Sequence, residues 1–364
     1  MDDMDRHSNP QVQEQPREPA SRRDRRGHRV SFWLAIVFGV GGALSLGLNM
    51  LLLLGLAAVV GGGAPSQQEF TVQEVEPGSG QRRLLLVELH DVISEQADEH
   101  LFGIGPSPVA AVSDRLDAAA EDLGIAGVLL SIDSPGGGVT ASDKLYHAVQ
   151  RYRERTGNPV LVHMGAVCAS GGYYVAMAAD RVLASPTTIT GSIGVIMALI
   201  DAEGLLEDKL GLQAVTIKSG PHKDMTSPWR DMTPAERAML QELVDTMYQR
   251  FVDIVLRKRV ASEALAGLDP DAAAAQLRNL ADGRIMHAEQ ALEGGLIDGI
   301  AYRDEVLEEL RALSGAGAAP LVRYRRLGGG LAGLLQARDP VADLDAAVRG
   351  ALQPSLEYRW RPGH

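Results

Sequence analysis

The sequence predicts an α/β fold of repeated βα units with a helical C-terminal part, preceded by one N-terminal transmembrane helix. Three observations carry this prediction. Residues 31–66 contain no charged residue. Residues 84–217 alternate short apolar runs with segments of helical spacing. Two glycine-rich turns each follow an apolar run directly, as do the loops at the carboxyl ends of parallel strands, where ligands bind in such sheets.

The transmembrane prediction depends on the apolar run at 32–60, which exceeds the ~20 residues needed to cross a bilayer. Five arginines between Arg22 and Arg29 precede the run, whereas residues 61–68 carry no positive charge. This bias places the N-terminus in the cytoplasm and the rest of the chain across the membrane. A cleaved signal peptide is the competing interpretation, with cleavage after Gly63-Ala64. Its apolar region is normally only ~7–15 residues long, so the length favours a retained anchor.

Composition shifts divide the chain into five parts. We expect a disordered cytoplasmic tail at 1–29, a transmembrane helix at 30–60, a linker at 61–80, a catalytic domain at 81–312 and a loosely packed C-terminal extension at 313–364. The tail is polar and the linker is rich in glycine, proline and serine, compositions that do not form a packed core. Folded structure is therefore expected mainly between residues 81 and 312.

The secondary structure inside this domain follows from periodicity. Apolar runs predict strands at 84–93, 127–132, 159–164, 181–184 and 213–217. Helical spacing predicts helices at 106–123, 140–156, 170–179 and 234–258, and a helical region at 261–310 broken at 283 and 294–295. The long helix has a start signal, because Thr233 can cap it, Pro234 suits its first turn and Glu236 completes a capping box. The alternation predicts a mainly parallel sheet with helices on both faces.

Charge and cysteine content exclude some classes of protein. The net charge is −12 and the isoelectric point is near 5.3, which argues against nucleic acid as a partner. Cys168 is the single cysteine, so neither an intrachain disulfide nor a zinc site of paired cysteines can form. We therefore expect no metal and no cofactor.

Ser170 is the leading candidate for a nucleophile. It lies in the small-residue turn 168–172, directly after the predicted strand 159–164, and a second glycine turn, 134–138, follows the strand 127–132. A serine nucleophile needs exposure to substrate, and the oxyanion that it creates needs preorganised N–H donors. Glycines let backbone N–H groups approach a substrate carbonyl closely. The pair of turns therefore favours acyl transfer.

The base that would activate this serine is left open by the residues alone. His163 lies within a strand, where a core histidine is expected. Lys218, His222 and Lys223 lie in a turn after the predicted strand 213–217. A lysine can act as a base when burial lowers its pKa towards 7, although surface charge is the plain alternative for these residues. Cys168 is a second candidate nucleophile without a positioned base, and we expect it to be structural.

Taken together, the motifs resemble those of the signal peptide peptidase A family, membrane-anchored serine–lysine peptidases related to the Clp protease and crotonase fold. The matching segments lie in the family's order across residues 84–310. They are Asp133-Ser134-Pro135-Gly136-Gly137-Gly138, Ala169-Ser170-Gly171-Gly172-Tyr173-Tyr174, Ala178-Ala179-Asp180, Thr190-Gly191-Ser192-Ile193-Gly194-Val195, Lys218-Ser219-Gly220-Pro221-His222-Lys223-Asp224, Ala281-Asp282-Gly283-Arg284 and Gly295-Leu296-Ile297-Asp298.

The resemblance implies catalytic roles at particular residues. Ser170 matches the family's nucleophile, and Lys223 matches its general base in preference to Lys218. Ser192 matches the serine that holds the lysine amine. The N–H groups of Gly137 and Gly171 match the oxyanion hole.

The resemblance also implies where substrate lies. An extended peptide would run along the strand edges at 134–137 and 190–192, with Ser134, Gly136 and Thr190 as binding residues. The family often has asparagine where this chain has Asp133. An aspartate suffices there if the side chain only fixes the loop, whereas specificity differs if it touches substrate.

The function implied is that of a serine endopeptidase without a cofactor, whose substrates are peptides and above all cleaved signal peptides. It would form a homo-oligomeric ring in the inner (plasma) membrane, with a cytoplasmic N-terminus and its catalytic domain on the periplasmic or extracellular side. One alternative is a membrane peptidase of the same superfamily that cuts a specific membrane protein. A crotonase-like acyl-CoA enzyme would not need Ser170 or Lys223, and a catalytically silent scaffold is the third alternative.

Overall fold

A computed structural model describes residues 24–60, 70–96, 99–100, 103–104, 106–326 and 355–359. The chain forms two compact units, residues 1–67 and 68–364. The predicted tail at 1–29 lies mostly outside the described residues, as does most of the predicted C-terminal extension.

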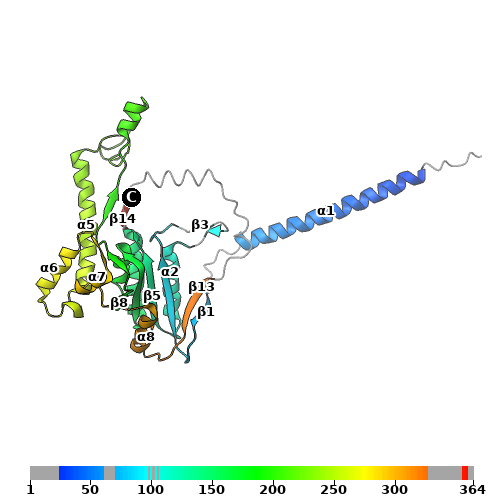
Figure 1. Cartoon of the computed structure of the whole chain (residues 1–364). Helices are drawn as coiled ribbons and strands as arrows, with labels where there is room; N and C mark the ends of the chain where they lie inside the picture. The colour runs from blue at the N-terminus through cyan, green and yellow to red at the C-terminus, as the bar shows by residue number, and fades with distance from the viewer. Residues whose placement is uncertain are drawn as a thin grey trace, which may run out of the picture. The chain divides into compact units, whose positions relative to one another are not determined.

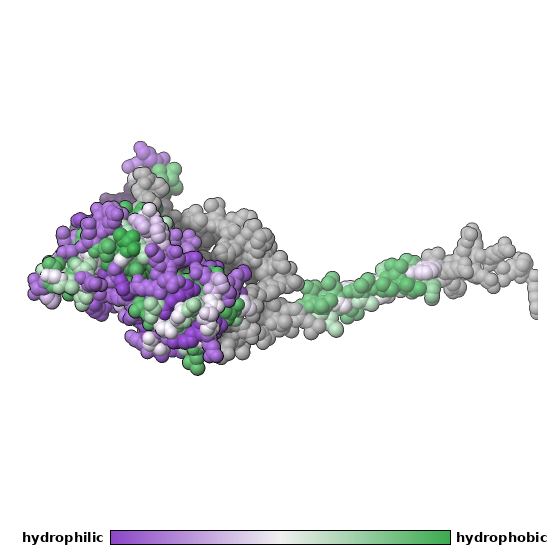
Figure 2. All heavy atoms as spheres, turned by 60° about the horizontal axis from the view of Figure 1, so that its bottom comes forward, coloured by the Kyte–Doolittle hydropathy of each residue, from purple (hydrophilic) through white to green (hydrophobic). Residues whose placement is uncertain are grey.

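The first unit contains the helix α1 (Asp24–Val60). Its segment Phe32–Leu53 has a mean hydropathy of 2.0 over 22 residues, and its side chains are exposed, which gives the helix the hydrophobic surface seen in Figure 2. By length and composition, this segment can cross a membrane. The predicted N-terminal apolar helix is therefore confirmed, beginning six residues earlier than expected.

The second unit is built from strands and helices in the following order. Its strands are β1 (Phe70–Glu76), β2 (Arg83–His90), β3 (Glu99–His100), β4 (Gly103–Ile104), β5 (Ile125–Ser134), β6 (Gly136–Gly138), β7 (Val160–Ala169), β8 (Arg181–Ala184), β9 (Ile189–Gly191), β10 (Ile196–Ala198), β11 (Ile285–His287), β12 (Gly299–Ile300), β13 (Leu321–Arg326) and β14 (Ser355–Arg359). Its helices are α2 (Pro108–Glu121), α3 (Val139–Thr156), α4 (Gly171–Ala176), α5 (Pro234–Arg259), α6 (Pro270–Leu280), α7 (Ala288–Glu293) and α8 (Arg303–Ser314), with a π-helical turn at Leu205–Lys209 and a 3₁₀ turn at Glu263–Leu265.

The main sheet has the order β1-β13-β2-β5-β7-β8-β12 (Figure 1). The neighbours β13, β2, β5, β7, β8 and β12 are parallel, and only β1 pairs antiparallel at the edge. Beyond the middle of β7, β9 pairs parallel to it, and β11 pairs antiparallel to β9. The predicted α/β architecture with a mainly parallel sheet is thus confirmed.

Both faces of the sheet are covered, as the near-continuous apolar strands require. Because side chains alternate along a strand, Leu85 and Val87 of β2 pack into the core shared with α2, α3 and α5. Leu84 and Leu86 instead pack on the opposite face, where α8 contributes Leu310. This burial fixes the parallel strands whose carboxyl ends carry the glycine turns.

The strand predicted at 213–217 is wrong. Residues 211–218 form neither helix nor strand, and Val215 and Ile217 are 82% and 97% exposed. Residues 199–232 form a segment, here called the arm, which lies at the end of α5 away from α6 (Figure 1). An apolar run predicts a strand only if a partner edge is available, and the arm offers none.

The sheet also extends beyond the predicted catalytic domain at both ends. β1 lies within the predicted linker, and β13 lies beyond residue 312, yet β13 is inserted between β1 and β2. The strand β13 was not predicted because its arginines interrupt the apolar pattern of a buried strand. One of them, Arg323, is accommodated by an ion pair with Glu88 at 3.2 Å.

The remaining elements agree closely with their patterns. The capping box of α5 is present, since Thr233 Oγ1 accepts the Glu236 N–H at 3.3 Å and Glu236 Oε2 accepts the Thr233 N–H at 3.0 Å. The strand predicted at 159–164 continues to Ala169, which brings it directly to Ser170. The region 261–310 contains the short strands β11 and β12 in addition to its helices.

Candidate active site

Ser170 lies between the end of β7 and the first turn of α4. Its backbone has φ 53° and ψ −117°, a conformation that is strained for a residue with a Cβ, and the residue is 1% exposed. The Ser170 N–H donates to the Gly191 carbonyl at 2.8 Å, which fixes the turn against β9. A serine held in a strained strand-to-helix turn is typical of a nucleophile.

Ser192, which the resemblance matched to a lysine-positioning serine, lines the same cavity as Ser170. The cavity has a volume of about 350 Å³. Ser192 also has a positive φ of 49°, and its N–H donates to the Arg284 carbonyl at 2.7 Å. Among the described non-glycine residues, Ser170, Ser192 and Asp91 alone have positive φ. Two of these three strained positions therefore meet at one cavity.

The N–H of Gly171 is positioned to act as a hydrogen-bond donor beside Ser170. It belongs to the first turn of α4, where N–H groups have no acceptor within their own helix. The Ser170 N–H is already used by Gly191, so it is Gly171 that offers a backbone donor at this turn. The helix N-terminus also favours developing negative charge.

Gly137 lies in β6, where the chain passes unusually close to Ile93. The Gly138 N–H donates to the Ile93 carbonyl and the Ile93 N–H donates to the Gly136 carbonyl, both at 2.9 Å. Because successive residues in a strand direct their polar groups to opposite edges, the Gly137 N–H points away from Ile93. A Cβ on Gly137 would lie 2.0 Å from the Ile93 carbonyl oxygen, so only glycine fits.

Ser134 and Thr190, two of the predicted substrate-binding residues, are fully buried and hold the turns together. Ser134 Oγ donates to the Asp91 carbonyl and accepts the Gly136 N–H. Thr190 Oγ1 donates to the Cys168 carbonyl at 2.6 Å. Both edges of β9 are paired, so the free edge expected at 190–192 is absent there. The next strand, β10, offers an edge instead.

That edge of β10 is occupied by the chain's own C-terminal strand. In a separate three-stranded sheet of order β10-β14-β6, β14 pairs antiparallel with both neighbours. Position 358 lies opposite Gly137 and position 356 lies opposite Met197. An extended segment therefore fits between the two strands that flank the Ser170 turn.

Three other candidate residues have structural surroundings. Asp133 Oδ1 accepts the Val167 N–H at 3.0 Å, so the aspartate fixes the end of β7 to the glycine turn. Burial raises the pKa of the Cys168 thiol, which keeps it neutral. His163 contacts Ser185 Oγ at 2.9 Å, and burial lowers the pKa of its imidazole. The last two observations agree with the predicted structural roles.

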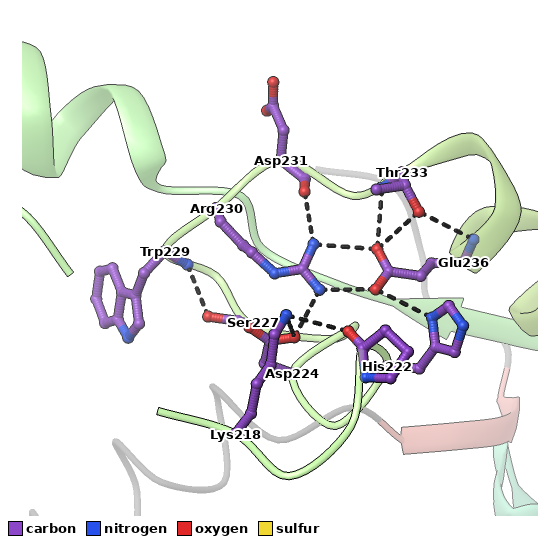
Figure 3. Close-up of polar contacts among 10 residues, drawn as sticks. Lys218, His222, Asp224, Ser227, Trp229, Arg230, Asp231, Thr233 and Glu236 are labelled. Carbon is purple, nitrogen blue, oxygen red and sulfur yellow. Dashed lines mark hydrogen bonds and ion pairs between the residues drawn. The ribbon is translucent and has the colours of Figure 1, made fainter. Parts of the chain in front are cut away.

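Lys218 and Lys223, the two lysines considered as the base, differ in their contacts; Figure 3 shows those of Lys218. Lys218 Nζ donates to Asp224 Oδ1 at 2.6 Å and to the Pro221 carbonyl at 3.0 Å. Lys223 is exposed, and its amine makes no hydrogen bond or ion pair with the described part of the chain. Lys223 is not among the residues that line the Ser170 cavity. Within one chain, the structure does not bring the predicted dyad together.

The helix α5 forms a wall of the Ser170 cavity that was not predicted from the sequence. Gln241, Val244, Asp245 and Tyr248 line it, and their i, i+3, i+4, i+7 spacing was the available signal. Tyr248 Oη donates to the Ala281 carbonyl at 2.7 Å, which joins this wall to the loop at 281–283.

The charge of Asp282 in that loop is paired locally. Asp282 forms an ion pair with Arg284, whose hydrogen bond holds the pKa of the Asp282 carboxyl at about 2. Asp282 and Gly283 both line the cavity. Asp282 therefore presents a fixed negative charge there at neutral pH.

The motif at 295–298 supports the site from the core. Arg259, which is 1% exposed, donates to the Gly295 carbonyl at 2.7 Å and to Asp298 Oδ1 at 2.8 Å. Tyr173 Oη donates to the Leu296 carbonyl at 2.7 Å. These contacts hold α4, and with it the Ser170 turn, against α5. In the described ranges, no group of three or more histidine, cysteine, aspartate or glutamate residues could hold a metal ion.

The comparisons with known proteins agree with a peptidase. Residues 152–317, which include the Ser170 turn and the arm, match the model of peptidase family S49. A protein of Enterococcus faecium named as a signal peptide peptidase SppA is 33% identical over 257 residues, which cover 71% of each chain.

Two further relatives cover less of their own length. A protein of Methanocaldococcus jannaschii named as a protease is 36% identical over 57% of this chain and 63% of its own. Protease 4 of Salmonella typhi is 29% identical over 56% of this chain, but this chain spans only 30% of it.

The fold and the strained serine thus belong to a peptidase. This chain is a member of peptidase family S49, the signal peptide peptidase A family, as the sequence motifs predicted.

Proposed function

We propose that this protein is a membrane-anchored serine endopeptidase in which Ser170 is the nucleophile and Lys223 the general base. The observation that carries the proposal is the strained Ser170 in the lining of a cavity, with Ser192 in the same lining and the Gly171 N–H in the next residue. A serine alone is a weak nucleophile at neutral pH, so a base must take its proton.

The proposed chemistry uses these groups in sequence. Neutral Lys223 accepts the Ser170 proton as Oγ attacks the peptide carbonyl carbon. The N–H groups of Gly137 and Gly171 stabilise the oxyanion, and losing one such donor costs about 3–4 kcal/mol of transition-state stabilisation. The protonated amine then donates its proton to the leaving nitrogen. Water, activated by the same lysine, hydrolyses the acyl-enzyme.

Substrate would bind as an extended strand between β6 and β10. The placement of β14 supports this mode, since an extended segment already pairs with both edges. Main-chain hydrogen bonds of this kind give affinity, whereas pockets give specificity. The cavity beside Ser170 contains Ile193, Val195 and Val244, which suits an apolar substrate side chain. Cleaved signal peptides are rich in such side chains, and we propose them as substrates.

A homo-oligomeric ring would complete the dyad. Lys223 lies outside the Ser170 cavity of its own chain, and the arm exposes several large apolar side chains, including Leu210, Leu212, Val215 and Ile217. We propose that the arm of one copy reaches the Ser170 cavity of the next copy. Contact between copies would also remove these side chains from water.

The anchor would be α1, with the N-terminus in the cytoplasm and the peptidase unit on the outer face of the plasma membrane. The arginines before the apolar run and their absence after it support this orientation. Protease added to cells stripped of any outer membrane and wall should then digest the C-terminal unit and spare a tag placed at residue 1.

The decisive experiment compares variants of the full-length protein in detergent, with an apolar peptide as substrate. Ser170→Ala and Lys223→Ala should each be inactive, and Lys218→Ala should retain activity. Mixed subunits of the two inactive variants should regain about a quarter of the wild-type rate, because half of the serines would meet half of the lysines in a shared site. Normal cleavage by Ser170→Ala would refute the serine mechanism. An inactive mixture would refute the shared site.

A further inference from the structure

A polar network on the arm surrounds the loop that carries Lys223 (Figure 3). At its centre, the Arg230 guanidinium donates to both oxygens of Glu236, at 2.7 and 3.0 Å. The same guanidinium donates to Asp224 Oδ1 at 2.8 Å. A planar guanidinium can bind two carboxylates in a fixed geometry, whereas an ammonium group cannot reproduce it.

One end of the network is anchored in α5. Glu236 lies in the first turn of that helix, and its side chain is only 3% exposed. Its Oε2 accepts the N–H of Thr233 at 3.0 Å and the hydroxyl of Thr233 at 2.9 Å. The carboxylate therefore has little freedom to move and provides a fixed point for Arg230.

The other end contacts both sequence neighbours of Lys223. Asp224 binds Arg230 and also accepts from Lys218 at 2.6 Å. His222 Nδ1 lies 3.5 Å from Glu236 Oε1. Backbone turns close the loop, as the Lys223 N–H donates to the Gly220 carbonyl at 3.3 Å. The loop is thus tied on both sides of a lysine whose own amine is exposed.

The network is balanced in charge. Hydrogen bonds from Arg230 hold the pKa values of Asp224 and Glu236 well below their usual range, and these carboxylates raise the pKa of Arg230. Two basic side chains, Lys218 and Arg230, thus face two carboxylates. Loss of one member changes both the loop position and the net charge beside Lys223.

We propose that Arg230, Asp224 and Glu236 are positioning residues that hold Lys223 where it can accept the serine proton. This inference rests on the proposed function, in which Lys223 is the general base. In this role the three residues act by fixing the loop and by keeping the charge around the amine neutral. The two roles make separate predictions, because one concerns rate and the other concerns the pH at which Lys223 becomes neutral.

The test uses the full-length protein in detergent and measures kcat, KM and thermal unfolding against pH for three Arg230 and Asp224 variants. Arg230→Gln leaves Lys218 as the one cation of the network that faces the two carboxylates. The excess negative charge favours the protonated form of the Lys223 amine. We expect kcat to fall at least tenfold with KM within twofold, and the rising limb of kcat to move to higher pH. Asp224→Asn leaves an excess of positive charge, so its rising limb should move to lower pH.

Arg230→Lys separates charge from geometry. It restores the charge, so its pH limb should match that of the wild type, but it lacks the bidentate contact and should recover only part of kcat. Arg237→Gln is the matched control, because Arg237 follows Glu236 directly, is exposed and makes no side-chain hydrogen bond with the described residues. We expect this control to behave as the wild type. Two further acidic residues adjoin the loop, where the Asp231 N–H donates to Glu203 Oε2 at 3.1 Å. Both residues are unchanged in every variant.

Three outcomes would overturn the inference. The first is an Arg230→Gln variant that matches Arg237→Gln in kcat and pH limb while Lys223→Ala is inactive; the proposed base would then stand without this network. The second is that Arg230→Gln and Asp224→Asn lose kcat and unfold at a lower temperature, but their rising pH limbs do not move in opposite directions. That result would indicate a structural role alone. The third is an active Lys223→Ala, which would refute the proposed base itself and with it the role of the network.

Discussion

Replacing Gly137 with alanine tests the close contact between β6 and Ile93 on which the proposed oxyanion hole depends. The new Cβ would lie 2.0 Å from the Ile93 carbonyl oxygen and 2.7 Å from its carbonyl carbon and backbone nitrogen. Contacts below 3.0 Å essentially never occur for real Cβ atoms, so β6 and residue 93 must separate by at least about 1 Å. Only backbone atoms are involved, and no flexible side chain can relieve the clash.

The separation has two calculable costs. It breaks or stretches the two 2.9 Å hydrogen bonds between Ile93 and β6, which contribute about 0.5–1.5 kcal/mol each. Overpacking adds about 1–3 kcal/mol, so the free energy of unfolding should fall by roughly 2–6 kcal/mol. The shift also moves the Gly137 N–H away from the oxyanion, and loss of one donor lowers kcat about 10²–10³-fold.

The assay combines peptide hydrolysis with thermal unfolding of the full-length protein. Gly138→Ala is the matched control, because its Cβ would meet Ala141 Cβ at 3.6 Å and Ile93 O at 4.0 Å, both ordinary contacts. Its φ of −60° also suits alanine. We expect the control to keep kcat within about threefold, since it introduces no clash. Equal kcat and equal unfolding temperature for the two variants would refute the reasoning.

Three further predictions follow from other parts of the fold. Removal of residues 355–364 should raise kcat/KM several-fold, since β14 occupies the edges proposed for substrate; an unchanged value would mean that β14 does not compete. Burial lowers the pKa of His163, so the unfolded chain binds a proton more readily than the folded chain. Stability should therefore fall as pH falls through ~6.5, and unfolding curves of His163→Gln should show a flatter dependence on pH. Arg259→Met should lower the free energy of unfolding by about 3–5 kcal/mol, because Asp298 loses its buried partner. Chemical denaturation measures this loss, and a smaller value would mean that Asp298 is hydrated instead.

The sequence determined those features that depend on local patterns. The uncharged run at 32–60 is sufficient to predict an apolar helix, and the alternation of runs and helical spacing predicts the parallel sheet. The capping box at Thr233 places the start of α5 to the residue, because it needs only four neighbouring positions. Likewise, a serine between small residues after a strand points to Ser170.

Tertiary structure decided which strand edges and surfaces have partners. The apolar run at 213–217 reads as a strand, but no edge meets it in the arm. The charged run at 321–326 does not read as a strand, but β1 and β2 provide edges on both sides. Thr190 similarly sits in the predicted motif, yet β11 closes the edge on which substrate was expected.

The candidate site likewise has features that follow from local sequence and features that depend on tertiary contacts. Motifs predict which residues are present, and Ser170 and Ser192 meet at one cavity because β7 and β9 are paired. The separation of Lys223 from that cavity, and the Arg230 network that surrounds it, depend on where the arm lies. Local sequence encodes propensity and spacing. The partners of an edge, a charge or an exposed lysine are set by contacts between distant segments, which only the folded chain supplies.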